Sequence, residues 1–91
     1  MELRRKVRIA NRQGLHARPC SAVVSAALEF RSELRVALDG REVNGKSILE
    51  LMTLNAAHGT ELELAARGAD AERLLERLER LFADGFGELG T

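Results

Sequence analysis

Apolar and polar residues alternate along several short segments of the chain, and this period of two is typical of strands with one buried face. The alternation predicts strands at residues 3–9, 34–38 and 62–66. A two-residue turn signal, Asp39-Gly40, follows the second of these segments, and both positions tolerate positive φ. We therefore expect a short strand at 41–43 that returns as a hairpin.

Apolar residues recur at helical spacing between and after these strands. One such stretch predicts a helix from His16 to Phe30, with Pro19 in the first turn, where its missing N–H costs little. Another predicts a final helix that begins after Asp70 as its N-cap residue. The apolar stripe of this last helix consists of Ala71, Leu74, Leu75, Leu78, Leu81 and Phe82.

A shorter helix is predicted between the third and fourth strands. Ser47 at the N-cap and Glu50 three residues later fit the capping-box pattern, in which each side chain bonds the other residue's backbone N–H. We expect this helix to end near His58, with Gly59 in the C′ position.

The predicted element order is strand, helix, strand, strand, helix, strand, helix. Four short strands in a chain of 91 residues cannot bury both faces of a sheet. The economical arrangement is one antiparallel sheet with helices on one face, so the predicted fold class is α+β. This length fits a single domain over residues 1–91, with a core at about 3–86.

Composition narrows the function classes. The chain has 14 basic and 14 acidic residues, and this balance argues against nucleic acid as a partner. The single cysteine can form neither an internal disulfide nor a thiolate zinc site, and we expect no cofactor or metal. The first ten residues lack the apolar segment of a signal peptide, and the apolar run at 22–28 is too short to span a bilayer. We therefore expect a cytoplasmic protein without membrane insertion.

His16 is the first candidate for chemistry, because it directly precedes a predicted helix. A helix start offers unpaired N–H groups and a positive dipole end, which suit a phosphate. The same field favours a neutral imidazole, which can attack phosphorus and form a phosphohistidine. Arg18 and Ala17 would lie beside the phosphoryl oxygens, and Gly14 would let the loop bend close. On spacing alone, an ordinary exposed loop histidine is the simpler interpretation.

Three other residues have a structural and a chemical interpretation. Cys20 is best explained as a small buried hydrophobe, although a helix start can activate a thiol. Ser47 is expected to cap its helix, and a cap serine is also a natural phosphorylation target. His58 is expected to meet the negative end of the second helix.

The second helix has more apolar residues than one face can bury. If Ile48, Leu51 and Asn55 share the buried stripe, then Leu49, Met52 and Leu54 include an exposed patch, which would mark a docking surface. A mostly buried short helix is the alternative. The candidate docking residues are Cys20, Ser21 and Val24 from the first helix and Ile48, Leu49 and Met52 from the second.

Two motifs resemble those of one known family. The run GLHARP at residues 14–19 resembles the active-site motif of HPr, the phosphocarrier of the bacterial phosphoenolpyruvate-dependent phosphotransferase system. The run VNGKSIL at residues 43–49 resembles the motif around the regulatory serine of HPr. The element order matches from about Leu3 to Phe86.

The resemblance implies an open-faced β-sandwich, with antiparallel strands in the order 1-4-2-3 covered by three helices. It also implies a mechanism in which enzyme I phosphorylates Nδ1 of His16, and phospho-His16 passes the group to an enzyme IIA. The protein would be a carrier rather than an enzyme, and a monomer that meets each partner in turn. With this strand order, Glu61 and Glu63 should face Lys6, Arg8 and Arg35 across the sheet.

The chain departs from the family pattern at Glu50, where many members carry glycine or lysine. An HPr kinase/phosphorylase is a candidate partner, but this charge argues against its recognition of Ser47. The ending at residues 81–87 resembles the nitrogen-related branch, which relays phosphate to a regulatory enzyme IIA instead of a sugar transporter. The alternative function is a regulatory binding module, switched by phosphorylation at Ser47 or His16 without onward transfer.

Overall fold

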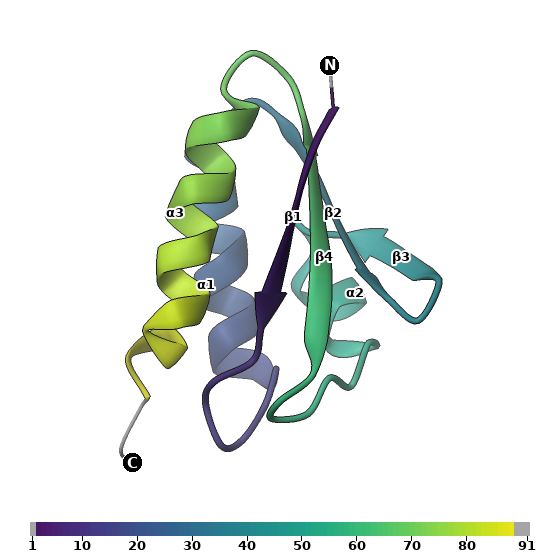
Figure 1. Ribbon diagram of the computed structural model, residues 1–91, viewed down its shortest axis with the longest axis vertical. Coiled ribbons are helices and arrows are strands. Elements are labelled where there is room, and N and C mark those ends of the chain that lie inside the picture. The colour runs from purple at the N-terminus through teal and green to yellow at the C-terminus, as the bar shows by residue number, and fades with distance from the viewer. Residues whose placement is uncertain (1, 89–91) are drawn as a thin grey trace.

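The structure is a computed structural model and describes residues 2–88. Its four strands form one antiparallel sheet in the order β1-β4-β2-β3, which confirms the expected fold class and strand order. Figure 1 shows β4 between β1 and β2. The elements are β1 (Glu2–Arg8), α1 (Ala17–Ala27), β2 (Glu33–Leu38), β3 (Arg41–Asn44), α2 (Ile48–Met52), β4 (Glu61–Arg67), α3 (Ala71–Ala83) and the 3-10 turn η1 (Gly85–Gly87).

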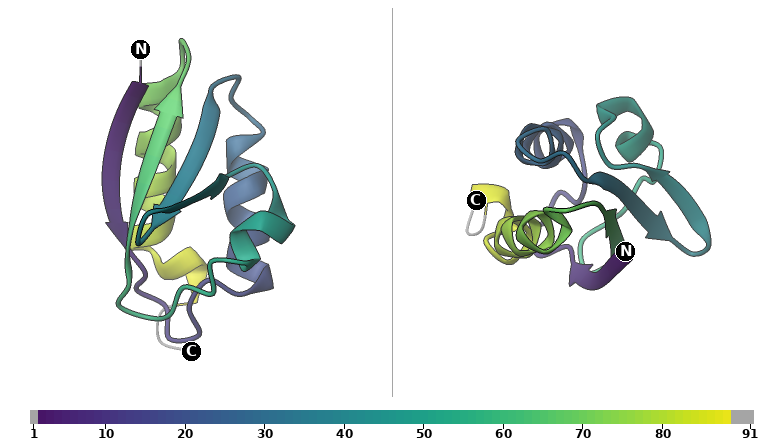
Figure 2. Two further views of the ribbon diagram at one scale, coloured as in Figure 1. Left: turned by 90° about the vertical axis from the view of Figure 1, so that its right-hand side faces the viewer. Right: turned by 90° about the horizontal axis from the view of Figure 1, so that it is seen from above.

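The core lies between the sheet and the two long helices. Figure 2 shows α1 and α3 packed side by side on one face of the sheet, with α2 beside α1 near the β3 end. Most inward residues of the strands are buried, as the alternation predicted, while Leu3 and Leu38 are partly buried against the core. In the stripe of α3 Leu81 is partly buried and packs against the core, and the other five residues are buried. The buried strand residues are Val7, Leu34, Val36, Val43, Leu62, Leu64 and Ala66.

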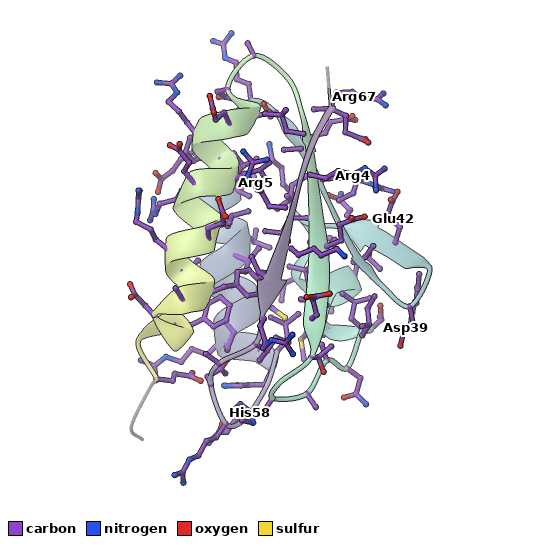
Figure 3. The ribbon with its side chains drawn as sticks, in the orientation of Figure 1. Arg4, Arg5, Asp39, Glu42, His58 and Arg67 are labelled. Carbon is purple, nitrogen blue, oxygen red and sulfur yellow. The ribbon has the colours of Figure 1, made fainter. Side chains whose placement is uncertain are left out.

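The other face of the sheet carries charged side chains from neighbouring strands (Figure 3). Arg8 lies opposite Glu61 in register, with 3.7 Å between Nη2 and Oε2, and Arg4 Nη1 lies 2.7 Å from Glu63 Oε1. The predicted pairing of β4 glutamates with β1 is therefore confirmed. The predicted partner Arg35 is wrong, because the register places it opposite Ala65 and its guanidinium contacts Glu42 at 3.4 Å.

The second helix is shorter than the sequence predicted. It ends at Met52 instead of near His58, and Asn55 adopts a left-handed conformation with φ 50°. The chain must turn there because Leu54 and Ala56 are both buried. Gly59 consequently lies in the turn before β4, where its N–H bonds the Ile9 carbonyl at 2.8 Å. The predictions for His58 and Gly59 at a helix C-terminus are therefore wrong.

Asp70 occupies the N-cap position of α3, but its side chain does not cap the helix. Its carboxylate instead accepts hydrogen bonds from the backbone N–H groups of Arg31 and Ser32, each at 3.0 Å, and from the Ser32 hydroxyl. The Ser32 hydroxyl is the main cause that lowers the pKa of Asp70 to about 2. Asp70 therefore connects the start of α3 to the α1–β2 loop.

Candidate functional site

Buried hydrogen bonds fix the conformation of the loop between β1 and α1. The Asn11 side chain is fully buried, and its Nδ2 donates to the Gly14 carbonyl at 2.8 Å. Gly14 has φ +74°, and a Cβ built on it would lie 2.6 Å from the Ala56 carbonyl oxygen. The Leu15 N–H donates to that same carbonyl oxygen at 2.8 Å. Only glycine fits this close approach, so the loop has a fixed shape in front of α1.

His16 is the N-cap residue of α1, with an extended backbone at φ −86° and ψ −169°. Its carbonyl accepts the Cys20 N–H at 3.1 Å, while its imidazole makes no cap hydrogen bond and is 35% exposed. Ala17 and Arg18 follow as exposed residues of the first helical turn. N–H groups in a first turn have no intrahelical partner, so this helix start favours an anion.

A carboxylate that the sequence analysis missed contacts the imidazole. Glu88 Oε1 lies 3.2 Å from His16 Nε2 and accepts a hydrogen bond from Asn11 Nδ2 at 3.0 Å. The hydrogen bond with His16 is the main cause that lowers the pKa of Glu88, and burial of the carboxylate opposes it. No periodic pattern pointed to Glu88, because it follows the last helix in a glycine-rich segment.

The site opens to solvent as a shallow pocket of about 250 Å³. Gln13, His16, Arg18, Gly87 and Glu88 line it. Figures 1 and 3 place the β1–α1 loop, His58 and the C-terminal segment at the same end of the molecule. Among residues 2–88 no group of three or more histidine, cysteine or acidic side chains could hold a metal. What the pocket offers is an accessible imidazole beside a cation and a helix N-terminus.

Ser47 caps α2 as predicted, since its Oγ accepts the Glu50 N–H at 3.2 Å. The reciprocal half of the capping box is absent. The Ser47 N–H bonds the Asn44 carbonyl, and the Glu50 carboxylate accepts the Asn44 N–H at 3.0 Å instead. Glu50 therefore stabilises the β3–α2 turn, and Ser47 supplies the cap by itself.

Three apolar side chains of α2 are exposed, and we call them the α2 patch: Ile48, Leu49 and Met52. Leu49 is 79% exposed, whereas Leu54 is buried and does not belong to the patch. The predicted buried stripe of this helix is wrong for Ile48 and Asn55, which face solvent, and right for Leu51.

Only one of the three docking candidates in α1 is available on the surface. Ser21 is exposed, whereas Cys20 and Val24 are buried against the core. Cys20 Sγ points inward to the Leu15 carbonyl at 3.5 Å, and burial raises the pKa of its thiol to about 11. We therefore withdraw Cys20 and Val24 from the docking surface, and Cys20 takes the buried role that its pattern indicated.

No helix within residues 2–88 is long and apolar enough to cross a membrane.

Comparison with known proteins identifies the family of the chain. The family described as "PTS HPr component phosphorylation site" matches residues 3–84. The chain is 44% identical over 82 residues to the phosphocarrier protein HPr of Treponema pallidum, covering 90% of this chain and 93% of that one.

Solved structures agree with this match. The crystal structure of HPr-C-His from Thermoanaerobacter tengcongensis superposes with a TM-score of 0.91 at 37% identity, covering 94% of this chain and 97% of that one. The Crh protein of Bacillus subtilis, described as a dimer with a swapped domain, has a TM-score of 0.75 at 38% identity, covering 89% and 93% of the two chains. The chain therefore belongs to the HPr family of phosphocarrier proteins of the phosphotransferase system.

Proposed function

We propose that this protein is a histidine phosphocarrier, which accepts a phosphoryl group from phospho-enzyme I on Nδ1 of His16 and passes it to an enzyme IIA. The observation that carries the proposal is the accessible imidazole of His16 at the N-terminus of α1, next to Arg18 in one shallow pocket. Family membership supports the carrier role.

The transfer needs positioning and charge stabilisation more than covalent assistance. The Nδ1 lone pair of His16 attacks phosphorus in line, while the P–N bond of the donor breaks and its electron pair returns to the donor imidazole. The N–H groups of Ala17 and Arg18 and the Arg18 guanidinium face the developing negative charge. Transfer to enzyme IIA reverses these steps on a new acceptor. Because His16 is phosphorylated by one partner and dephosphorylated by the next, the protein acts as a carrier and not as an enzyme.

An exposed site suits a carrier for energetic reasons. A buried cage of cations would hold the phosphoryl group tightly and slow its departure, whereas solvent-exposed charges interact weakly. Arg18 is exposed, so its guanidinium can approach the phosphoryl group during transfer and withdraw afterwards. We propose that the α2 patch and Ser21 form the surface on which both partners dock in turn.

We propose a monomeric, cytoplasmic, single-domain carrier of residues 1–91 that serves either sugar uptake or the nitrogen-related relay. The dimeric relatives make the oligomeric state a necessary check, and sedimentation of the free protein at working concentration decides it. A stable dimer would contradict the shuttling arrangement, because one surface must meet two partners in succession.

The test is a discharge experiment. Protein charged by enzyme I and phosphoenolpyruvate is freed from the donor and mixed with purified enzyme IIA proteins of the sugar and nitrogen-related branches. Return of the protein to its unmodified mass, with a matching gain on one enzyme IIA, supports the proposal and identifies the branch. Retention of the phosphoryl group against both would contradict onward transfer.

The same reagents separate the carrier from the regulatory module. In the carrier, His16→Ala abolishes charging and Ser47→Ala leaves it intact. In the regulatory module, binding of a partner depends on the modified residue and no enzyme IIA gains phosphate.

A further inference from the structure

The C-terminal segment is folded back toward His16 by its own short turn. After α3, the Gly87 N–H bonds the Asp84 carbonyl at 3.1 Å and the Glu88 N–H bonds the Gly85 carbonyl at 2.9 Å. Phe86 adopts a left-handed conformation with φ 57°, and its ring packs edge-on against Phe82 with 4.8 Å between centroids. Aromatic pairs in this geometry stabilise beyond their buried area. This turn therefore positions Glu88 in the pocket beside His16.

Contacts with Asn11 and His16 help to hold the Glu88 side chain there. It is 12% exposed, and Oε1 lies 3.0 Å from Asn11 Nδ2 and 3.2 Å from His16 Nε2. Asn11 is itself buried and uses its second N–H on the Gly14 carbonyl. The side-chain amide of Asn11 therefore connects the β1–α1 loop, through the Gly14 carbonyl, to Glu88 after the last helix.

The chemistry of the two groups determines where the imidazole proton lies. An ionised carboxylate can only accept hydrogen bonds, and the hydrogen bond with His16 lowers the pKa of Glu88, which keeps it ionised at neutral pH. Nε2 must therefore be the protonated nitrogen in this contact. In a neutral imidazole the other nitrogen, Nδ1, then carries the lone pair.

We propose that Glu88 is a positioning residue for phosphoryl transfer: its carboxylate holds the proton on Nε2 of His16, orients the ring and leaves Nδ1 as the nucleophile. This inference rests on the proposed phosphocarrier function and adds to it a residue that follows the last helix. In metal sites and in Ser-His-Asp triads, a carboxylate that accepts a hydrogen bond from a histidine ring N–H likewise fixes the tautomer and orientation of that ring.

The proton balance is simple. The Nδ1 lone pair forms the new bond to phosphorus, the P–N bond of the donor breaks, and the Nε2 proton stays in place. The phosphorylated ring then carries a positive charge beside the Glu88 carboxylate. When enzyme IIA takes the phosphoryl group, the electron pair returns to Nδ1 and the ring is neutral again. No proton needs to move at His16 in either step.

The experiment compares the full-length wild type with Glu88→Ala, Glu88→Gln and the control Glu76→Ala, which removes an exposed glutamate of α3. The ¹⁵N chemical shifts of the two His16 ring nitrogens report the tautomer directly. We expect a protonated Nε2 and a bare Nδ1 in the wild type and the control. In Glu88→Ala the two nitrogens should move toward each other, while Glu88→Gln keeps an acceptor oxygen and retains the wild-type tautomer.

Kinetics of charging by phospho-enzyme I supply the second measurement. We expect kcat to fall about 3–10-fold in Glu88→Ala, the usual range for a lost hydrogen bond, with KM unchanged. Glu88→Gln should recover part of the loss, and Glu76→Ala should match the wild type.

Unchanged ring shifts in Glu88→Ala would overturn the inference, as would changed shifts with an unchanged kcat. Failure of every protein to accept phosphate would instead contradict the proposed function, and the ring shifts would still decide the role of Glu88 in placing the proton.

Discussion

Replacement of Gly14 by alanine tests whether the loop before His16 is held by a fixed contact. Gly14 has φ +74°, and an added Cβ would lie 2.6 Å from the Ala56 carbonyl oxygen and 3.1 Å from the Ala57 Cα. Both neighbours are backbone atoms, so neither can rotate away as a side chain would. The Gly14 carbonyl also accepts Asn11 Nδ2, and the Ala56 oxygen accepts the Leu15 N–H.

Two costs add in Gly14→Ala. A left-handed backbone costs an L-residue roughly 1–2 kcal/mol, and forcing extra volume into a packed contact costs roughly 1–3 kcal/mol. The free energy of unfolding should therefore fall by about 2–5 kcal/mol. Each kcal/mol lowers the melting temperature of a domain of this size by about 4–8 °C, so a drop of at least about 8 °C is expected.

Gly40→Ala is the matched control. Gly40 lies in the β2–β3 hairpin with φ +82°, and an added Cβ there meets nothing within 4 Å. It should show only the backbone cost, about 1–2 kcal/mol. Urea titrations of both variants measure the difference, which isolates the contact with Ala56. If Gly40→Ala is as destabilising as Gly14→Ala, the argument for a tight contact at Gly14 is wrong.

Other predictions concern single side chains. The hydrogen bonds that lower the pKa of Asp70 to about 2 stabilise the fold above the unfolded pKa of about 4, and this contribution is lost as pH falls toward 2. The gap in urea midpoint between wild type and Asp70→Asn should thus be largest at neutral pH and close near pH 2, and a gap independent of pH would contradict this. Ser47→Ala should lower the free energy of unfolding by about 1 kcal/mol in the same titration, because the side-chain cap at the N-terminus of α2 is lost; an unchanged midpoint would count against that role. Cys20, whose burial raises its pKa to about 11, should react with a thiol reagent only after unfolding, and rapid labelling of the native protein would show that it is accessible. Leu49→Asp should weaken binding to enzyme I and enzyme IIA without loss of stability, because the side chain is exposed in the α2 patch, and unaltered binding to both would place the docking surface elsewhere.

The strands and long helices could be predicted because their burial follows a simple period. Leu34 and Val36 point to the core two residues apart, and Leu74 and Leu78 share one face of α3. The strand order has no such local signal. It came from the resemblance of whole motifs, since alternation alone cannot tell which strands are neighbours.

The errors arose where distant contacts override local preference. The end of α2 is set by the burial of Leu54 and Ala56, and the carboxylate of Asp70 is used by a loop remote in sequence. Glu88 reaches His16 through a turn built by glycines and an aromatic pair, 72 residues along the chain. The sequence could single out His16 as a candidate because its surrounding run occurs as a continuous motif, and the predicted position before α1 agrees with its N-cap position in the structure.

The most direct test of the account is intact-protein mass spectrometry after incubation with enzyme I and phosphoenolpyruvate, for the wild type and His16→Ala. The account predicts a gain of one phosphoryl group on the wild type, labile in acid, and no gain on the variant. An equal gain on both proteins would place the phosphoryl group on another residue. No gain on the wild type, while a control HPr charges normally and a nitrogen-related enzyme I also fails, would contradict the carrier function.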